Sequence, residues 1–149
     1  MWIGCQRYTK EYPGYLSRNG GECWTIDLDP KVAKWGSLGH HLIWDIRLID
    51  ELLAVNSFDI VLCNGVLGFG VNELADQKQT MKAVARIMKP GGWFLIGWNS
   101  DRTPDPISNE MITRHFERAA PPGIEGHISV LGSTHVYDFL RRKNSTIDV

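Results

Sequence analysis

One short stretch near the middle of the chain, residues 57–64, most constrains the fold. It reads Ser-Phe-Asp-Ile-Val-Leu-Cys-Asn, so a turn residue and an acid lead into a continuous apolar run. A run of this kind favours a strand that is buried on both faces, as in a parallel sheet. In open α/β sheets the ligand crevice lies outside the carboxyl ends of the strands. We therefore expect any functional site to lie near Asn64, where the run ends.

The residues that follow predict a strand–helix–strand unit. Apolar residues recur at three- and four-residue intervals over residues 72–88, which indicates an amphipathic helix. A Lys-Pro-Gly-Gly turn at residues 89–92 then leads into a second apolar run over residues 93–98. The crossover between the two strands should be right-handed.

The remaining elements are shorter. We expect strands over residues 1–4, 22–28 and 40–46, helices over 11–18, 31–35, 48–55 and 107–119, and a hairpin of 128–131 with 135–140. The first strand is either stubby or begins within a longer chain. Because strands alternate with helices and two strands pair at the end, we predict a mostly parallel sheet of about seven strands with an antiparallel edge. The domain should cover residues 1–141, and residues 142–149 form a polar C-terminal tail.

Composition narrows the class of partner. The chain has 149 residues, and 16 Lys and Arg balance 17 Asp and Glu, so no electrostatic footprint for nucleic acid or an anionic membrane is present. The three cysteines are scattered, which argues against a disulfide framework and a structural metal site. Reduced thiols in a cytoplasm are the simple interpretation. No apolar run is as long as a membrane-spanning helix.

Four segments together resemble the class I S-adenosylmethionine-dependent methyltransferases, and type 11 methyltransferases in particular. Residues 56–61 look like that family's "SFD" strand and residues 88–96 like its "LKPGG" turn and fifth strand. Residues 25–30 and 44–46 are similar to its second and third strand ends, and the resemblance spans Trp2 to Leu140. It implies a Rossmann-like three-layer α/β sandwich with an antiparallel C-terminal strand, and S-adenosylmethionine as the cofactor.

The resemblance also implies roles for two acids. Asp27 would bind the ribose hydroxyls, and Asp45 would meet the adenine amine, with Leu28 and Ile46 sandwiching the base. A carboxylate at a strand tip is suited to accept two hydrogen bonds from a ribose diol. Asp27 is alternatively a turn residue, but Asp29 already fills the helix-capping role, so we favour ligand binding. For Asp45, a ligand contact and an exposed strand-end acid are equally good interpretations.

The first glycine motif departs from the family pattern "DxGxGxG". Residues 2–8 read Trp-Ile-Gly-Cys-Gln-Arg-Tyr, so Trp2 replaces the acid, and Gln6 and Tyr8 replace two glycines. Two outcomes are open. Either these side chains line the methionine end of the site, with Arg7 pairing its carboxylate, or they fill the pocket and abolish cofactor binding. A nicotinamide site is less well supported, because its glycine fingerprint is absent. The predicted cofactor-binding residues are Gly4, Cys5, Gln6, Asp27, Leu28, Asp45, Ile46 and Asn64.

The methyl acceptor is less constrained than the cofactor. Asn64 is followed by Gly-Val-Leu and not by Pro-Pro-aromatic, so methylation of DNA bases or glutamine is not supported. Further candidates to line the site are Trp98, Asn99 and His40 or His41, although a plain loop–strand junction is the commoner role of such histidines. No catalytic residue is assigned. We predict a methyltransferase acting on a small molecule; the alternative is an inactive methyltransferase-like domain that serves as a binding or assembly module.

The oligomeric state follows from what precedes the first strand. Family members usually carry helices there that cover the substrate, and this sequence has none. Apolar surface around Trp2 and Phe69 should then be exposed, and large exposed patches usually mark interfaces. We therefore expect a homodimer or another partner chain.

Overall fold

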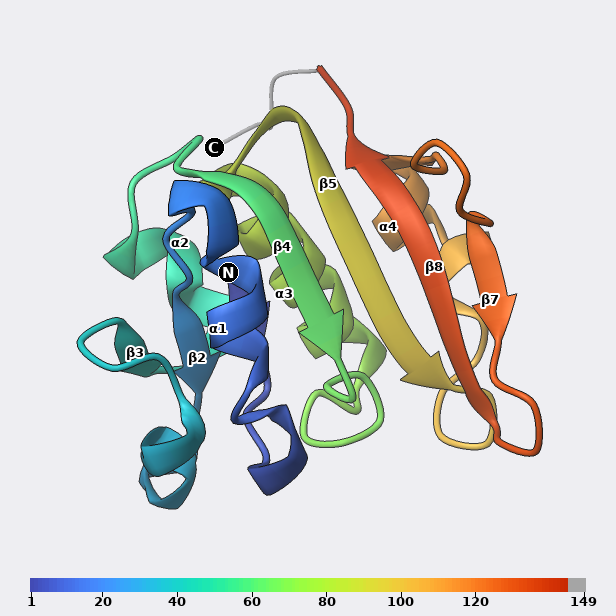
Figure 1. Cartoon of the computed structure of the whole chain (residues 1–149). Helices are drawn as coiled ribbons and strands as arrows, with labels where there is room; N and C mark the ends of the chain where they lie inside the picture. Colours follow the sequence, from blue (N-terminus) through green and yellow to red (C-terminus); the bar gives the residue numbers. More distant parts are fainter. Residues whose placement is uncertain (145–149) are drawn as a thin grey trace.

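An eight-stranded mixed sheet forms the centre of the molecule (Figure 1). The computed structural model describes residues 1–144, and the strand order is β3-β2-β1-β4-β5-β8-β6, with β7 also paired to β8. The strands are β1 (Trp2–Ile3), β2 (Thr25–Asp27), β3 (His41–Ile43), β4 (Phe58–Asn64), β5 (Met88–Asn99), β6 (Phe116–Arg118), β7 (His127–Ser129) and β8 (His135–Arg142).

Strands β1 to β5 run parallel, and β8 runs antiparallel to β5, β6 and β7. This confirms the predicted sheet, in which only the C-terminal part is antiparallel. The chain goes from β1 outward to β2 and β3, then returns to place β4 on the other side of β1. The strand order therefore reverses between β1 and β4, which is where open α/β sheets bind ligands.

Short helices connect the strands. The α-helices are α1 (Tyr12–Leu16), α2 (Ile49–Leu52), α3 (Leu74–Ile87) and α4 (Glu110–Thr113); the 3-10 helices are η1 (Arg7–Thr9), η2 (Arg18–Gly20), η3 (Pro30–Trp35), η4 (Ile46–Leu48) and η5 (Pro106–Ser108). In Figure 1, α3 and α4 lie behind the sheet and α1 lies in front of it, near β1. Among the described residues, no helix lies in front of β5 and β8.

The main core lies between the sheet and α3. The apolar face of α3 buries Met81, Val84 and Ile87 completely, against Val61 of β4 and Phe94 of β5 in the same cluster. Full burial of one such side chain contributes roughly 1.5–3 kcal/mol, so this face fixes the helix on the sheet. The predicted helix over residues 72–88 is thus confirmed to within two residues at each end.

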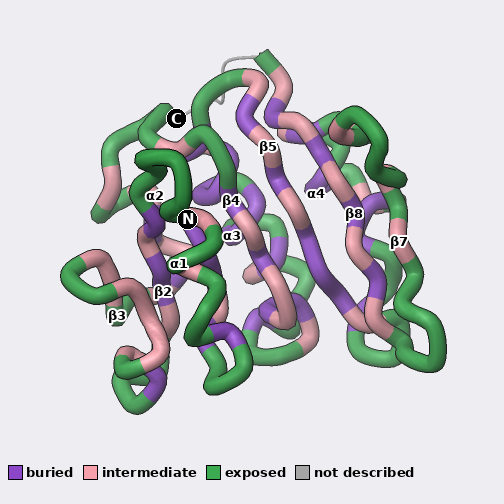
Figure 2. The backbone as a smooth tube through the Cα atoms, in the orientation of Figure 1, coloured by how far each residue is buried: buried purple, intermediate pink, exposed green. Residues whose placement is uncertain are grey.

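The strand over residues 57–64 is confirmed, but its predicted burial on both faces is wrong. Val61 and Cys63 are fully buried against the rear layer, whereas Ile60 is 47% exposed on the opposite face. Figure 2 shows the same alternation of buried and more exposed residues along β4 and β8. The reason is the thin front layer, which leaves one side of β4 accessible.

Two strands are shorter than predicted, β2 mainly at its start and β3 mainly at its end, and an acidic cap follows each. Asp29 accepts a hydrogen bond from the Lys31 amide at 2.9 Å, which starts η3 two residues after β2. Asp45 accepts from the Arg47 amide at 3.0 Å and starts η4 two residues after β3. The predicted strands over 22–28 and 40–46 therefore shrink to three residues each.

The predicted helix over residues 107–119 is largely wrong. Only Glu110–Thr113 is α-helical, and Phe116–Arg118 forms strand β6 instead. Phe116 is 1% exposed, and its ring centroid lies 4.7 Å from that of Phe94 in β5. Burial of this aromatic pair against the sheet outweighs local helix propensity.

Two further expectations concern the ends of the chain. Trp2 is only 7% exposed, and the Tyr12 ring packs edge-on against it at a centroid distance of 4.9 Å. The expected exposed apolar surface is therefore wrong at Trp2, whereas Phe69 is 50% exposed, as expected. At the other end, β8 continues through Arg142, one residue into the predicted tail. Residues 145–149 of that tail lie outside the described residues. Over residues 1–144, none of the helices combines the length and the apolarity that a membrane span needs.

Candidate functional site

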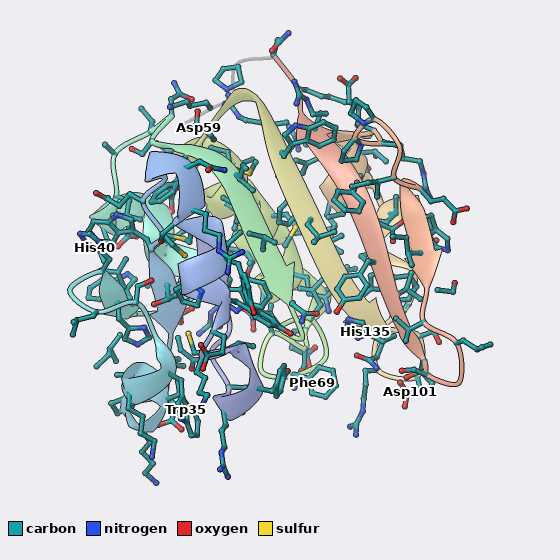
Figure 3. All side chains as sticks on the ribbon, viewed as in Figure 1. Trp35, His40, Asp59, Phe69, Asp101 and His135 are labelled. Atoms are coloured by element: carbon teal, nitrogen blue, oxygen red, sulfur yellow. The ribbon has the colours of Figure 1, made fainter. Side chains whose placement is uncertain are left out.

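A crevice of about 450 Å³ opens at the carboxyl ends of β1, β2 and β4. Its volume lies within the roughly 300–1,000 Å³ of small-molecule sites. Figure 3 shows Phe69 and His135 at this lower edge of the sheet. The lining residues are Ile3, Gly4, Gln6, Tyr8, Ile26, Asp27, Leu28, Trp44, Asp45, Ile46, Arg47, Asn64, Gly65, Val66, Phe69, Gly70, Val71, Asn99 and His135.

Gly4 brings the backbone close to the floor of the crevice. It has a φ of +87°, and a Cβ at this position would lie 3.1 Å from the Asn64 carbonyl oxygen and 3.4 Å from a Val66 methyl group. Its amide donates to the Ile26 carbonyl at 3.0 Å, which ties the loop to β2. The one glycine that survives in the altered motif is therefore the one whose position has no room for a side chain.

Asp27 lies at the end of β2 and organises the first loop. One carboxylate oxygen accepts from the Cys5 amide at 2.8 Å, and the other accepts from the Asp29 amide at 2.9 Å. Each carboxylate oxygen has a second lone-pair direction, so both retain capacity to accept from a ligand in the crevice. Cys5 takes part only through its backbone. Its side chain is 1% exposed and packs in a separate cluster with Trp2 and Val32, away from the crevice.

Asp45 lines the crevice but is already held by a cation. The Arg47 Nη2 lies 2.6 Å from its carboxylate, and the Arg47 Nε donates to both oxygens at 3.0 Å. These hydrogen bonds keep the pKa of Asp45 below its usual range. Arg47 also pairs with Asp76 of α3 at 3.0 Å, so the end of β3 is clamped to that helix. An adenine amine would share the Asp45 carboxylate with Arg47.

The altered first loop leaves the crevice open. Gln6 adopts an extended backbone with φ of −141°, so it needs no glycine, and its amide donates to the Thr9 hydroxyl at 3.0 Å. Tyr8 is 66% exposed and lines the crevice without filling it. Arg7 is exposed and does not line the crevice.

His135 is a site residue that the sequence reasoning missed. Its Nδ1 lies 2.9 Å from the Asn99 Oδ1, and the Asn99 amide nitrogen donates to the Thr134 hydroxyl at 2.9 Å. This relay assigns the proton to Nδ1 and leaves Nε2 as an acceptor. Burial lowers the pKa of His135, which favours the neutral ring. The sequence held a signal for this residue. An antiparallel strand that pairs with a parallel one begins at the edge where the parallel strand ends, and His135 is the first residue of β8.

Two buried polar atoms on the crevice floor lack partners among the described residues. They are the Nε2 of His135 and the Oδ1 of Asn64. Both approach Gly97 of β5, where a Cβ would lie 2.1 Å from the Asn64 oxygen and 3.0 Å from the His135 nitrogen. A side chain at position 97 would collide with both atoms, so Gly97 keeps Asn64 and His135 in place on the crevice floor.

The other candidate residues lie elsewhere. Trp98 points to the rear of the sheet, where its indole donates to the Asp138 carboxylate at 2.9 Å. His40 stacks on Trp24 at 4.8 Å, and the His41 Nδ1 lies 2.9 Å from the Thr25 hydroxyl. Neither histidine lines the crevice. Seven of the eight predicted cofactor-binding residues do line it, with Cys5 the exception. Trp44, Arg47 and Phe69 join them without having been assigned a role.

Comparison with known families identifies the class of protein. The sequence model of a family described as a methyltransferase domain matches residues 3–96, which is more than half of the chain. The chain therefore belongs to this family of S-adenosylmethionine-dependent methyltransferases. Family membership indicates S-adenosylmethionine as the cofactor. A comparison with curated proteins gave no match.

Solved structures share the fold at low sequence identity. A TehB-like methyltransferase from Corynebacterium glutamicum has a TM-score of 0.69 at 19% identity, over 95% of this chain and 80% of that one. The N-methyltransferase NodS from Bradyrhizobium japonicum, solved with S-adenosyl-L-homocysteine, has a TM-score of 0.71 at 14% identity, over 95% and 76%. A 1,6-didemethyltoxoflavin-N1-methyltransferase from Burkholderia thailandensis has a TM-score of 0.65 at 15% identity, over 96% of this chain and 71% of that one. These likenesses confirm the Rossmann-like methyltransferase fold.

Proposed function

We propose that the chain binds S-adenosylmethionine in this crevice and transfers its methyl group to a small molecule. The observation that carries the proposal is the open crevice of about 450 Å³ at the point where the strand order reverses. The neighbours solved with S-adenosylhomocysteine share this fold, which supports the choice of ligand.

The ribose and the adenine of the cofactor each have a partner of suitable chemistry in the crevice. Asp27 is the ribose anchor, since both of its oxygens keep acceptor capacity beside the crevice. Leu28 and Ile46 offer apolar contacts for the adenine ring, and Leu28 is 66% exposed and free to close on a base. Gly4 permits close approach of the ligand to the loop backbone.

The methyl transfer itself needs positioning more than reactive side chains. The acceptor atom forms a bond to the methyl carbon while the carbon–sulfur bond breaks and its electron pair stays on sulfur. S-adenosylmethionine supplies the activated methyl group as a sulfonium. When the acceptor is an N–H or O–H group, its proton goes to a base or to solvent. His135 is the only histidine that lines the described crevice, and we assign it as the candidate base.

The acceptor is a small molecule in this proposal because the volume of the crevice, about 450 Å³, lies in the range of small-molecule sites. The rim residues Tyr8 and Phe69 are 66% and 50% exposed, and aromatic rims suit flat or apolar acceptors. A direct test is to incubate the chain with S-adenosylmethionine and a panel of small amines, phenols and thiols, and to measure S-adenosylhomocysteine by mass spectrometry. A higher turnover of the wild-type chain than of the His135→Gln variant supports the proposal.

The competing hypothesis is an inactive domain that binds or assembles. It predicts cofactor binding without turnover for any acceptor, or no cofactor binding at all. The retained Gly4 geometry and the unfilled crevice favour the enzyme. The cytoplasmic location remains a prediction.

The homodimer also remains a proposal, now on a different surface. Trp2 is buried, but Ile60 is 47% exposed on the front of the sheet, where the described helices leave β5 and β8 uncovered. Light scattering tests it: a monomer at high protein concentration would contradict the proposal.

A further inference from the structure

A second pocket, which shares no lining residue with the crevice, carries an unusual concentration of positive charge. It has a volume of about 330 Å³ and is lined by Lys78, Gln79, Lys82, Glu110, Met111, Arg114 and His115. These residues come from α3, α4 and the two residues that follow α4. The lining thus holds three permanent cations, one histidine and a single acid, whereas the whole chain has a net charge of −1.

Glu110 is the single acid in the lining, so the cations of this pocket outnumber their counter-charge. None of the three cations Lys78, Lys82 and Arg114 makes an ion pair with another residue of the range 1–144. By contrast, Arg47 and Arg86 of the same layer are paired with acids at 3.0 Å. What distinguishes the pocket is that three cations without an ion pair line the same cavity.

Arg142 supplies an independent observation behind the pocket. It is 6% exposed, and its Nε and Nη1 have no hydrogen-bond partner among the described residues. It lies in register with Phe116, next to His115, and the Lys143 amide donates to the His115 carbonyl at 2.9 Å. The alternation of β8 places Arg142 on the same face as Leu140, which is the face that α3 and α4 cover.

A buried, unpaired guanidinium costs free energy. The Nε and Nη1 of Arg142 need acceptors that residues 1–144 do not supply and that water, a ligand or a partner can provide. The pKa of His115, which lines the pocket, is lowered first by burial and then by the nearby cations Arg114, Lys82, Arg142 and Lys143. The positive charge of Arg142 therefore acts on this pocket. An anion in the pocket would offset the charges of Lys82 and Arg114 directly and that of Arg142 from a greater distance.

We propose that the groove between α3 and α4 is a binding site for a small phosphate-bearing molecule, held by Lys78, Lys82 and Arg114, with the charge of Arg142 behind them. Phosphate oxygens take several charge-assisted hydrogen bonds from lysine and arginine at once. The volume of about 330 Å³ is at the low end of small-molecule sites, so a phosphate with a small substituent fits it. The balanced overall charge does not favour a long polyanion, which needs an extended basic surface.

Calorimetric titration of the full chain with inorganic pyrophosphate is the first test. We expect saturable binding that the double variant Lys82→Gln/Arg114→Gln weakens by about tenfold or more. The matched control Lys31→Gln/Lys34→Gln removes two charges from η3, outside the pocket, and should leave the affinity unchanged. No saturation at millimolar pyrophosphate, or equal loss in both double variants, would overturn the proposal.

Two further measurements separate a binding role from a structural one. Arg142→Met should weaken pyrophosphate binding and leave the melting temperature of the ligand-free chain unchanged or raised, because it removes an unpaired buried charge. A lowered melting temperature with unchanged affinity would make Arg142 a structural residue and contradict the proposal. By NMR, pyrophosphate should raise the pKa of His115, since an anion offsets the surrounding cations.

Competing sources of negative charge are tested in the same way. The last five residues include Asp148, so a chain that ends at Asn144 is titrated alongside the full chain. Equal affinities of the two chains for pyrophosphate support the proposal. Binding by the truncated chain alone would mean that the last five residues occupy the cations in the full chain, and would contradict it. A short single-stranded oligonucleotide that binds more tightly than pyrophosphate would assign the groove to nucleic acid instead.

Discussion

Gly4 is the residue at which the crevice tolerates least change. We expect Gly4→Ala to lower the free energy of unfolding by about 1–2 kcal/mol, because alanine is strained at φ of +87° and its Cβ meets the Asn64 carbonyl. Chemical denaturation measures this directly. Gly14→Ala is the matched control: it lies in α1 with open space around the added Cβ, so it should be neutral or stabilising. Equal effects at both positions would contradict this account of the first loop.

His135 carries the prediction about chemistry. We expect His135→Gln to lower turnover by about 100-fold or more with an acceptor that must lose a proton. The affinity for S-adenosylhomocysteine should change little, because the ligand's proposed ribose anchor is Asp27. His40→Gln, outside the crevice, is the control and should keep full turnover. Unchanged turnover in His135→Gln would remove this histidine from the mechanism.

Among the elements, β6 is the one whose identity depends on tertiary packing. We expect Phe116→Ala to destabilise the chain by about 3–5 kcal/mol, as large aromatic deletions in cores do. Glu117→Ala on the same strand is exposed and should cost less than about 0.5 kcal/mol. Denaturant unfolding of both variants compares them. A small effect of Phe116→Ala would mean that β6 contributes little to the core.

The elements also show which parts of the fold and of the crevice could be predicted from the sequence. Residues 57–64 and the helix over 72–88 were predictable because their apolar periodicity is strong and reflects burial in a single core. The helix over 107–119 failed because periodicity does not report the pairing of Phe116 with a strand far along the chain. The acids at the ends of β2 and β3, Asp27 and Asp45, were predicted as site residues, and both line the crevice. His135 was missed although its strand was predicted, because the sequence does not show that β8 pairs with β5 and brings its first residue to the crevice. The thin front layer that exposes Ile60 is likewise a property of the assembled layers.

At the scale of the whole molecule, three histidines predict how stability depends on pH. Burial is the main cause that lowers the pKa of His41, His115 and His135 below the ordinary value of 6.5. Below that value the unfolded chain binds more protons than the folded chain. The free energy of unfolding therefore decreases as the pH is lowered. Urea unfolding at about pH 7 and about pH 5.5 should show this loss, and His135→Gln should reduce it. Equal stability at both pH values would contradict the lowered pKa values.

The central claim is that the crevice binds S-adenosylmethionine with Asp27 as its ribose anchor. Calorimetric titration with S-adenosylmethionine and S-adenosylhomocysteine tests it most directly. A charge-assisted hydrogen bond contributes about 1.5–3 kcal/mol, so Asp27→Ala should weaken binding by roughly 10-fold to 100-fold. Asp29→Ala removes the same charge two residues away, outside the crevice, and should leave the affinity nearly unchanged. Gln6→Gly should leave the affinity unchanged or improve it, because it restores room for backbone approach. Saturable binding with this order of affinities is the predicted result; no binding at millimolar ligand, with no rescue by Gln6→Gly, would contradict the account.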